Sequence, residues 1–150
     1  ELYGCYTREE VFTLVGRQTA KVKMQGTASG AFNLPEYNAV LLFVTLNKSE
    51  KDFSPSTQYN DYLINDEYFH WQSKNTDSHY NSGGRKYIEQ PKTGIKIILF
   101  VREEKKDGFG NTSPFHCFGL VDYVSSHDDF PMNVKWQLQK PAMAQYLKAI

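Results

Sequence analysis

The sequence predicts a mainly β domain of the α+β class: a curled antiparallel sheet or small β-barrel with a short N-terminal helix and few other helices. Three apolar runs, at 40–46, 95–101 and 115–124, are rich in β-branched and aromatic residues, as strands are. Alternation of apolar and polar residues at 132–138 indicates a further, half-buried strand. Because 150 residues is the usual size of one domain, we expect a single domain over residues 1–150.

A short helix is expected close to the N-terminus. Thr7 and the glutamate three positions later have the spacing of a capping box, in which side chain and backbone satisfy each other reciprocally. Val11, Leu14 and Val15 then share one face at helical spacing, and Gly16 is a natural end.

We expect the strands to pair antiparallel. The segment 105–111 carries the Gly and Asp residues of a hairpin loop, which favours antiparallel pairing of 95–102 with 115–124. A parallel pair requires a crossover connection, usually a helix, and no long helical pattern lies between the apolar runs.

The charge balance singles out no class of partner. Lys and Arg together number 17, as do Asp and Glu, so the formal net charge is zero. The distribution is uneven, because residues 68–106 hold eight Lys or Arg against four Asp or Glu. The middle of the chain is therefore locally basic.

The cellular setting is expected to be cytoplasmic, with no membrane partner. Cys5 and Cys117 lie far apart, and we interpret them as reduced thiols. The sequence has no signal peptide and no apolar run long enough to span a bilayer. The chain begins at Glu1 without a Met, which suggests a piece of a longer polypeptide.

Evidence for catalysis or a metal centre is thin. The four His and two Cys residues lack the paired spacing of zinc ligands, so no metal or other cofactor is expected for this domain. Cys117 lies in an apolar run, where an inert buried thiol is common, and Gly108 and Gly110 belong to a hairpin and not to a phosphate loop. A hydrolase that uses His70 with Asp61 is the weakest hypothesis.

The stretch FHWQSKN, at 69–75, poses the main question. In a strand, Phe69 and Trp71 face one way while His70 and Gln72 face the other, so the stretch is either core with a polar outer face or a surface for a nucleobase. Aromatic residues interleaved with Arg, Lys, Asn and Gln surround it, and such mixtures suit base recognition. The loop 78–86 ends in two cations that suit a phosphate backbone.

Several blocks along the chain resemble a known family, the C-terminal domain of unknown function of large helicase proteins. The blocks are LLFVTLNK at 41–48, YNDY at 59–62, FHWQS at 69–73, LFVRE at 99–103, PF at 114–115 with Gly119, and PM at 131–132 leading to Trp136, Leu138 and Pro141. Many members resemble restriction proteins with a phospholipase-D-type nuclease and a helicase-like ATPase, and the nearest resemblance is to SauUSI-like type IV enzymes.

The resemblance implies a non-enzymatic DNA-recognition domain. It implies specificity for 5-methylcytosine or 5-hydroxymethylcytosine in double-stranded DNA, with the helicase and nuclease domains of the parent chain as further partners. ATP and Mg would serve only that parent. An SRA- or PUA-like barrel extrudes the modified base into a pocket, whereas a B3-like pseudobarrel, the structural alternative, reads it in the major groove. The alternative function is a structural coupling domain that docks on the helicase with little DNA specificity.

Our own interpretation of the residues assigns roles for the extrusion mechanism. A carboxylate accepts a hydrogen bond from cytosine N4, and rings stack on the base. The predicted modified-base pocket is Tyr59, Asp61, Tyr62 and Trp71; the residues predicted to complete the base edge or fill the vacated stack are His70, Gln72, Ser73 and Asn75; the predicted phosphate contacts are Lys74, Arg85 and Lys86.

Overall fold

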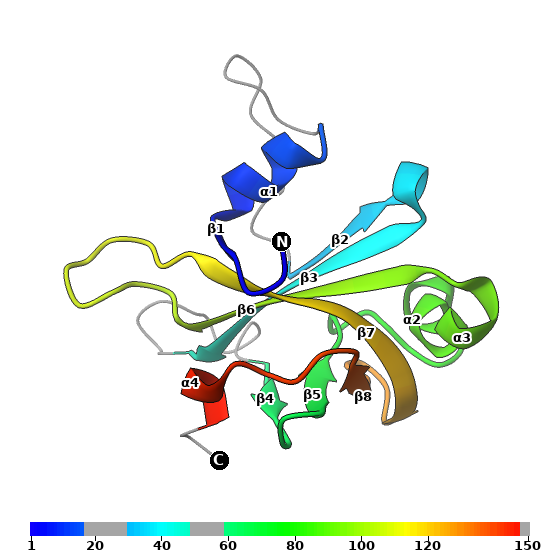
Figure 1. Cartoon of the computed structure of the whole chain (residues 1–150). Coiled ribbons are helices and arrows are strands. Elements are labelled where there is room, and N and C mark those ends of the chain that lie inside the picture. The colour runs from blue at the N-terminus through cyan, green and yellow to red at the C-terminus, as the bar shows by residue number, and fades with distance from the viewer. Residues whose placement is uncertain (17–29, 49–58, 148–150) are drawn as a thin grey trace.

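The computed structural model describes residues 1–16, 30–48 and 59–147, and in this part of the chain strands predominate (Figure 1). The mainly β class predicted from the sequence is therefore confirmed. The strands are β1 (Cys5–Tyr6), β2 (Ala31–Leu34), β3 (Ala39–Asn47), β4 (Tyr62–Leu63), β5 (Tyr68–Gln72), β6 (Lys96–Glu104), β7 (Phe115–His127) and β8 (Asn133–Leu138). The helices are α1 (Arg8–Leu14), the 3-10 turn η1 (Pro35–Tyr37), α2 (Ser82–Ile88), α3 (Gln90–Thr93) and α4 (Ala144–Leu147).

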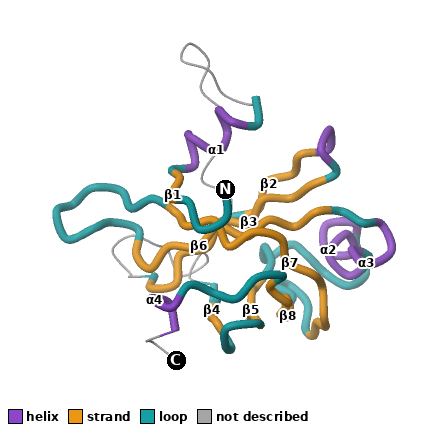
Figure 2. The backbone as a smooth tube through the Cα atoms, in the orientation of Figure 1, coloured by secondary structure: helices purple, strands orange, loops and turns teal. Residues whose placement is uncertain are grey.

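The described strands form one curled, open sheet in the order β2-β3-β6-β7-β8-β5-β4, with β1 paired to β7 (Figure 2). The outer strands β2 and β4 are not paired with each other, so the described strands do not close into a barrel. The predicted hairpin is confirmed, because β6 pairs antiparallel with β7 from Ile97 opposite Val121 to Val101 opposite His116.

The expectation of antiparallel pairing was wrong for one pair of strands, since β3 and β6 run parallel from Ala39 opposite Lys96 to Asn47 opposite Glu104. The connection between them passes through the β4–β5 hairpin and then through α2 and α3. A crossover made of a hairpin and two short helices leaves no long helical pattern in the sequence, which is why the pattern did not reveal it. The parallel pair brings the carboxyl ends of β3 and β6 to one edge of the sheet.

Both faces of the central strands are buried. On β3, Val40, Leu42 and Val44 pack into a core shared with β5 and β8, whereas Leu41 and Phe43 pack into a second core on the opposite face. A strand covered on both faces is apolar throughout, which explains the uninterrupted run at 40–46. The part of the sheet formed by β4, β5 and β8 curls over the core that contains Val40, Leu42 and Val44 (Figure 1).

The N-terminal helix forms as predicted and covers the second core with a different face. Thr7 Oγ1 accepts a hydrogen bond from Glu10 N at 3.1 Å, which confirms the capping box, and Gly16 follows the helix with a positive φ of 76°. Val11 and Phe12 are buried, but Leu14 is 72% exposed, so the expectation that Leu14 shares the buried face was wrong.

Two simpler observations complete the fold. No helix in the described residues is long and apolar enough to cross a membrane. Cys5 is exposed, Cys117 is buried, and the two are not joined by a disulfide.

Candidate nucleic-acid interface

The alternation predicted for FHWQSKN is present in β5. Phe69 and Trp71 are buried on the inner face, whereas His70 and Gln72 are half-buried on the outer face. The stretch is therefore core on one side and a polar surface on the other, which agrees with the first of the two interpretations. Contact of the outer face with a nucleobase stays a prediction.

Trp71 belongs to the core. Its ring lies 5.0 Å from Tyr87 and 6.1 Å from Trp136, centroid to centroid, and the residue is 4% exposed. Because side chains alternate along a strand, the face that holds Trp71 is the one that Tyr62 and His70 avoid. The structure does not bring Trp71 together with the other residues of the predicted pocket.

Asp61 is held by hydrogen bonds on both carboxylate oxygens. Gln72 N donates to Oδ1 at 2.8 Å, and Lys48 Nζ donates to Oδ2 at 3.0 Å and to the carbonyl of Tyr59 at 2.9 Å. Burial raises the pKa of the Asp61 carboxyl, while Lys48 and the Gln72 amide oppose that shift. In this arrangement Asp61 anchors the segment that enters β4, and its oxygens are already occupied.

The outer face of β5 is a continuous hydrogen-bonded and stacked surface. The ring of Tyr62 stacks on that of His70 with centroids 4.6 Å apart, and Tyr62 remains 44% exposed. His70 Nδ1 lies 2.8 Å from the carbonyl of Asn60, and Nε2 lies 3.0 Å from Asn133 Oδ1, which also accepts from Gln72 Nε2. His70 therefore supports the ring of Tyr62 from one side, and Gln72 shares with His70 the acceptor Asn133 Oδ1.

The remaining predicted residues lie farther along the chain. Ser73 is buried, and its hydroxyl donates to the carbonyl of Lys74 and accepts from Met132 N. Lys74 and Asn75 are exposed in the loop after β5. The residues of this group thus extend away from the outer face of β5 and do not continue it.

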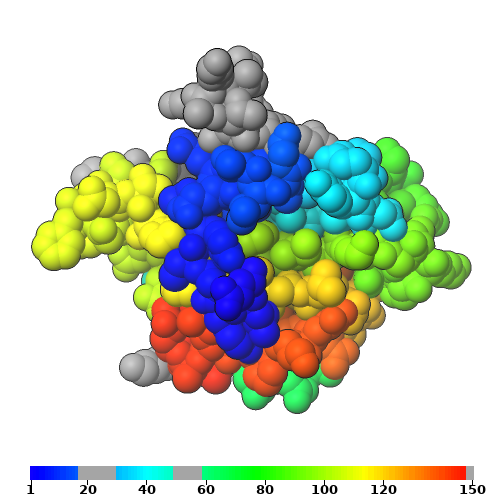
Figure 3. Space-filling model, turned by 45° about the horizontal axis from the view of Figure 1, so that its top comes forward, coloured from blue at the N-terminus to red at the C-terminus, as the bar shows by residue number. Residues whose placement is uncertain are grey.

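The two cations predicted to hold phosphates stand on α2. Arg85 pairs with Glu89, Nη2 to Oε1 at 2.6 Å, and Lys86 Nζ donates to Asn33 Oδ1 at 3.0 Å. In Figures 1 and 3, α2 and the loop between β6 and β7 lie at opposite sides of the molecule. Arg85 and Lys86 are therefore not gathered around the edge where β3 and β6 end.

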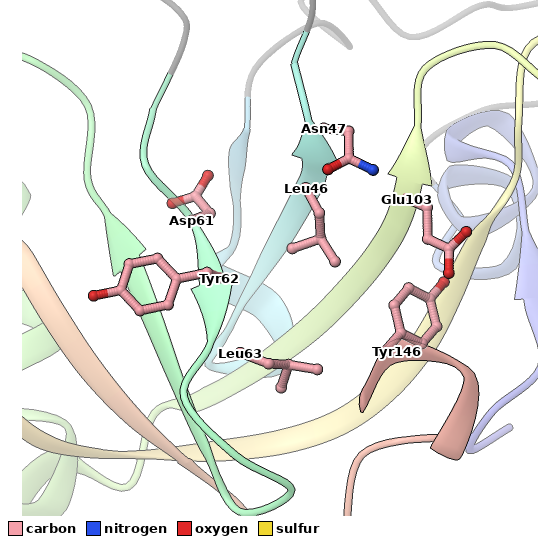
Figure 4. Close-up of a pocket in the computed structure, with 7 residues that line it drawn as sticks. All are labelled: Leu46, Asn47, Asp61, Tyr62, Leu63, Glu103 and Tyr146. Carbon is pink, nitrogen blue, oxygen red and sulfur yellow. The ribbon is translucent and has the colours of Figure 1, made fainter. Parts of the chain in front are cut away.

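A cleft of about 220 Å³ lies at that edge (Figure 4). Leu46 and Leu63 point into its middle, and Asn47 and Glu103 stand at its rim. Tyr146 of α4 forms one side and Asp61 with Tyr62 the other, with the Tyr62 ring turned away from the middle. At roughly 30 Å³ per water molecule the cleft has room for one small ring and not for a drug-sized ligand.

A second hollow, of about 370 Å³, adjoins the cleft and shares Glu103 and Tyr146 with it. The Tyr146 hydroxyl donates to the carbonyl of Val101 at 3.1 Å and lies 2.5 Å from His116 Nδ1, so this shared wall is fixed. Burial raises the pKa of Tyr146, and the nearby Glu103 charge adds to that shift. The phenol is therefore neutral, and its hydrogen bonds to Val101 and His116 hold α4 against the sheet.

The sequence interpretation missed five residues that line the cleft: Leu46, Asn47, Leu63, Glu103 and Tyr146. Three of them stand at the ends of the apolar runs that form β3 and β6. Ligands favour the carboxyl ends of parallel strands, so recognition of the parallel pair was the signal that would have located them. Asn47 and Glu103 also lie inside two of the blocks that carry the family resemblance.

A separate chain of hydrogen bonds joins the loop after β5 to the end of β7 and to the turn between β7 and β8. His79 Nδ1 lies 2.9 Å from Asp129 Oδ1, and His79 Nε2 lies 2.7 Å from Ser126 Oγ. This order of contacts resembles a catalytic triad, but these residues line neither of the two hollows described above. We interpret this chain of hydrogen bonds as a structural tie between the loop after β5 and the β7–β8 turn.

The weakest hypothesis, a hydrolase that pairs His70 with Asp61, finds no direct contact to rest on, since each side chain hydrogen-bonds to other groups. Among the described residues, no group of three or more His, Cys, Asp or Glu is arranged to hold a metal ion.

Comparison with protein families gives one result. A family model described as "Domain of unknown function (DUF3427)" matches residues 1–149 of the chain. Comparison with curated proteins gives no match.

Proposed function

We propose, from the premise that the chain belongs to the DUF3427 family, that it is a DNA-binding module that recognises modified cytosine in duplex DNA. The modification would be 5-methylcytosine or 5-hydroxymethylcytosine, and the module would supply specificity to a type IV restriction enzyme. The family resemblance given above suggests the ligand class. The observation that carries the proposal is the small cleft at the ends of β3 and β6, which has the size and the polarity of a pyrimidine site.

The composition of the cleft suits an extruded methylated pyrimidine. Leu46 and Leu63 offer an apolar surface for a C5 methyl group, and the amide of Asn47 offers one donor and one acceptor for the ring edge. The exposed carboxylate of Glu103 accepts hydrogen bonds only, which suits the N4 amino group of cytosine. Extrusion costs a few kcal/mol, so these contacts and stacking must recover that amount.

Thymine sets the hardest test of specificity. Thymine carries the same C5 methyl group as 5-methylcytosine but presents an O4 acceptor where cytosine presents an N4 donor. A methyl slot alone would therefore accept every thymine in the genome. An acceptor-only side chain repels O4, and in this cleft Glu103 takes the role that the sequence interpretation gave to Asp61.

The ring of Tyr62 points out of the cleft and offers a stacking surface to a base that flanks the extruded one. His70 covers one face of this ring, and the 44% exposure of the residue leaves the other available to that flanking base. Stacking of a base on an aromatic side chain contributes roughly 1–3 kcal/mol. Of the predicted pocket residues, Tyr62 lines the cleft but turns its ring out of it, whereas Tyr59 and Asp61 hold the segment in place and Trp71 packs in the core.

The near-zero net charge predicts modest affinity for the DNA backbone. Lys106 lines the hollow beside Glu103 and Glu104, so positive charge stands close to the acidic edge. Lys74, Arg85 and Lys86 contact phosphates only if the duplex extends toward the α2 side of the molecule. Much of the nonspecific affinity would then come from other domains of a longer protein.

The second candidate function is structural coupling to a helicase. It is favoured by Leu14 and Tyr37, which expose 72% and 50% of their surface on α1 and η1, away from the cleft. Exposed apolar side chains are common singly, so this observation carries less than the cleft does. A coupling domain would show no methylation-dependent binding in isolation.

The experiment that tests the proposal is fluorescence anisotropy with the domain and one duplex with randomised flanks, unmodified or with 5-methylcytosine, at two salt concentrations. We expect the methylated duplex to bind at least about tenfold more tightly, which corresponds to 1.4 kcal/mol. The preference should persist at the higher salt, where backbone contacts weaken for both duplexes alike. Equal and strongly salt-dependent binding would overturn the proposal and favour the coupling function.

A further inference from the structure

The loop between β6 and β7 carries an aromatic residue at its tip. Phe109 is 92% exposed, the largest value among the exposed large hydrophobic residues of the described chain. It lies between Gly108 and Gly110, and two lysines, Lys105 and Lys106, precede it in the loop. Single exposed apolar side chains are common, so the exposure of Phe109 carries weight only together with the rigid loop that holds it and the cleft beside that loop.

The loop is built to hold this tip in place. Asp107 Oδ1 accepts hydrogen bonds from Phe109 N at 2.8 Å and from Asn111 N at 3.0 Å. Asp107 N donates to the carbonyl of Asn111 at 2.8 Å, and Gly110 closes the turn with a φ of +82°, which glycine adopts without strain. An isolated bridge between Lys106 and Thr112 pins the stem.

The stem is anchored in the core below it. Arg102, which is buried, donates from Nε to Thr45 Oγ1 at 2.8 Å and from Nη1 to the carbonyl of Ser113 at 3.1 Å. Its guanidinium also lies 4.2 Å from the centre of the Phe115 ring. These contacts fix both ends of the hairpin, at the end of β6 and at the start of β7.

The hairpin rises directly beside the cleft. The hollow at its base is lined by Lys106, Asp107, Ser113 and Pro114, and it shares Glu103 and Tyr146 with the cleft. Phe109 follows the end of β6 by five residues, so its reach beyond the strand is at most about 17–18 Å. The space-filling view shows the hairpin projecting from the body of the molecule (Figure 3).

We propose that Phe109 is a wedge that enters the duplex and fills the stack vacated when the modified cytosine moves into the cleft. This inference rests on the proposed function. Proteins that kink or open DNA insert apolar side chains between base steps in this way, and an orphaned stack offers a flat apolar site to a phenyl ring. The wedge replaces His70, Gln72, Ser73 and Asn75, which the sequence interpretation put forward for this role and which lie on or beyond β5.

The test compares Phe109→Ala with Tyr80→Ala, a matched control that removes an aromatic ring with 88% exposure from a loop elsewhere. Each variant and the wild type are titrated with a 5-methylcytosine duplex and with a probe that carries the same base in a single-stranded overhang, where no stack is vacated. We expect Phe109→Ala to weaken binding to the duplex about tenfold, to leave binding to the overhang unchanged, and Tyr80→Ala to change neither.

A second variant, Phe109→Trp, tests the wedge by fluorescence and does not depend on binding to the overhang probe. The indole introduced by Phe109→Trp should lose fluorescence on addition of the methylated duplex, because stacking between bases quenches it, while Trp71 and Trp136 stay buried in the core. An indole whose emission does not change on binding would overturn the wedge.

The outcomes separate the wedge from the proposed function. If the wild type prefers methylated DNA and Phe109→Ala binds it as tightly, the wedge is wrong and the modified-cytosine reader stands. Equal weakening on duplex and overhang, or an equal loss in Tyr80→Ala, also overturns the wedge, because Phe109 is then a general contact. If the wild type shows no preference for methylated DNA, the proposed function fails, and the wedge fails with it.

Discussion

Two regions of the sheet place polar side chains next to aromatic rings. In one region these side chains hydrogen-bond within the domain, and in the other they face an open cleft. In the segment before β4, Asp61 accepts hydrogen bonds from Lys48 and from the backbone N of Gln72. In β5, the side chain of Gln72 accepts from Asn60 N and donates to Asn133, so the hydrogen-bonding capacity of both side chains is used within the domain. At the ends of β3 and β6, Asn47 and Glu103 stand at the rim of a cleft, and Glu103 is exposed. Polar residues inside a strand mostly hold the fold, whereas polar residues where two parallel strands end together face an open site.

The largest expected effect tests whether the inner face of β5 is core. Trp71→Ala should lower the free energy of unfolding by about 4 kcal/mol, because it removes a buried indole packed on Tyr87 and Trp136. Tyr62→Ala, at a 44% exposed position, should cost less than about 1 kcal/mol. Urea denaturation of both variants measures the difference. If Trp71→Ala left stability unchanged and abolished binding, β5 would be the reading surface instead.

The next effect tests whether Asp61 is structural. Lys48→Met should cost about 3 kcal/mol at neutral pH, because it leaves a buried carboxylate without its cation. Lys48 lowers the pKa of Asp61, so its loss lets burial raise that pKa further above 3.8. The folded state then binds more protons than the unfolded state between those values. The stability of the variant should therefore fall as pH rises through this window.

Urea midpoints measured between pH 4 and pH 7 check this prediction. Asp61→Asn in the Lys48→Met background is the control, since an amide carries no charge and should remove the pH dependence. A Lys48→Met variant as stable as the wild type at every pH would show that the pair is not a buried structural contact.

The smallest effect concerns the tie between the loop after β5 and the β7–β8 turn. Hydrogen bonds from the backbone and ring of His79 lower the pKa of the exposed Asp129. A lowered pKa stabilises the fold above the unfolded value of 3.8, and this stability is lost as pH falls through the folded value. Asp129→Asn should flatten the acid side of the stability profile slightly, as followed by thermal melts; an unchanged profile would mean that the tie contributes nothing.

The fold was predictable where one local pattern determines one element. The capping box at Thr7, the apolar runs and the Gly-Asp loop of the β6–β7 hairpin each depend on residues close together in sequence. The parallel pairing of β3 with β6 was not predictable in this way, because it depends on a crossover made of a hairpin and two short helices.

The candidate site was predictable only in part, for the same reason. Tyr62 was identified because aromatic and acidic residues cluster around it in sequence. Glu103 and Tyr146 reach the same cleft from β6 and α4, more than forty residues apart, and Phe109 becomes conspicuous only when its exposure is known. Sequence clustering found the residues that support the site, and strand order was needed to find those that line it.

The most direct test of the central claim, that the cleft reads modified cytosine, compares Glu103→Ala with Glu104→Ala. Both remove one exposed carboxylate from the end of β6, but only Glu103 lines the cleft. Each protein is titrated with duplexes that carry 5-methylcytosine or thymine opposite the same guanine. Because the mismatch opens more easily for every variant alike, the change in preference relative to wild type isolates the contact at position 4 of the base.

The account predicts that Glu103→Ala lowers the preference for 5-methylcytosine over thymine about tenfold, or 1.4 kcal/mol, while Glu104→Ala keeps the wild-type preference. A preference unchanged in Glu103→Ala, or lowered equally in both variants, would contradict the account.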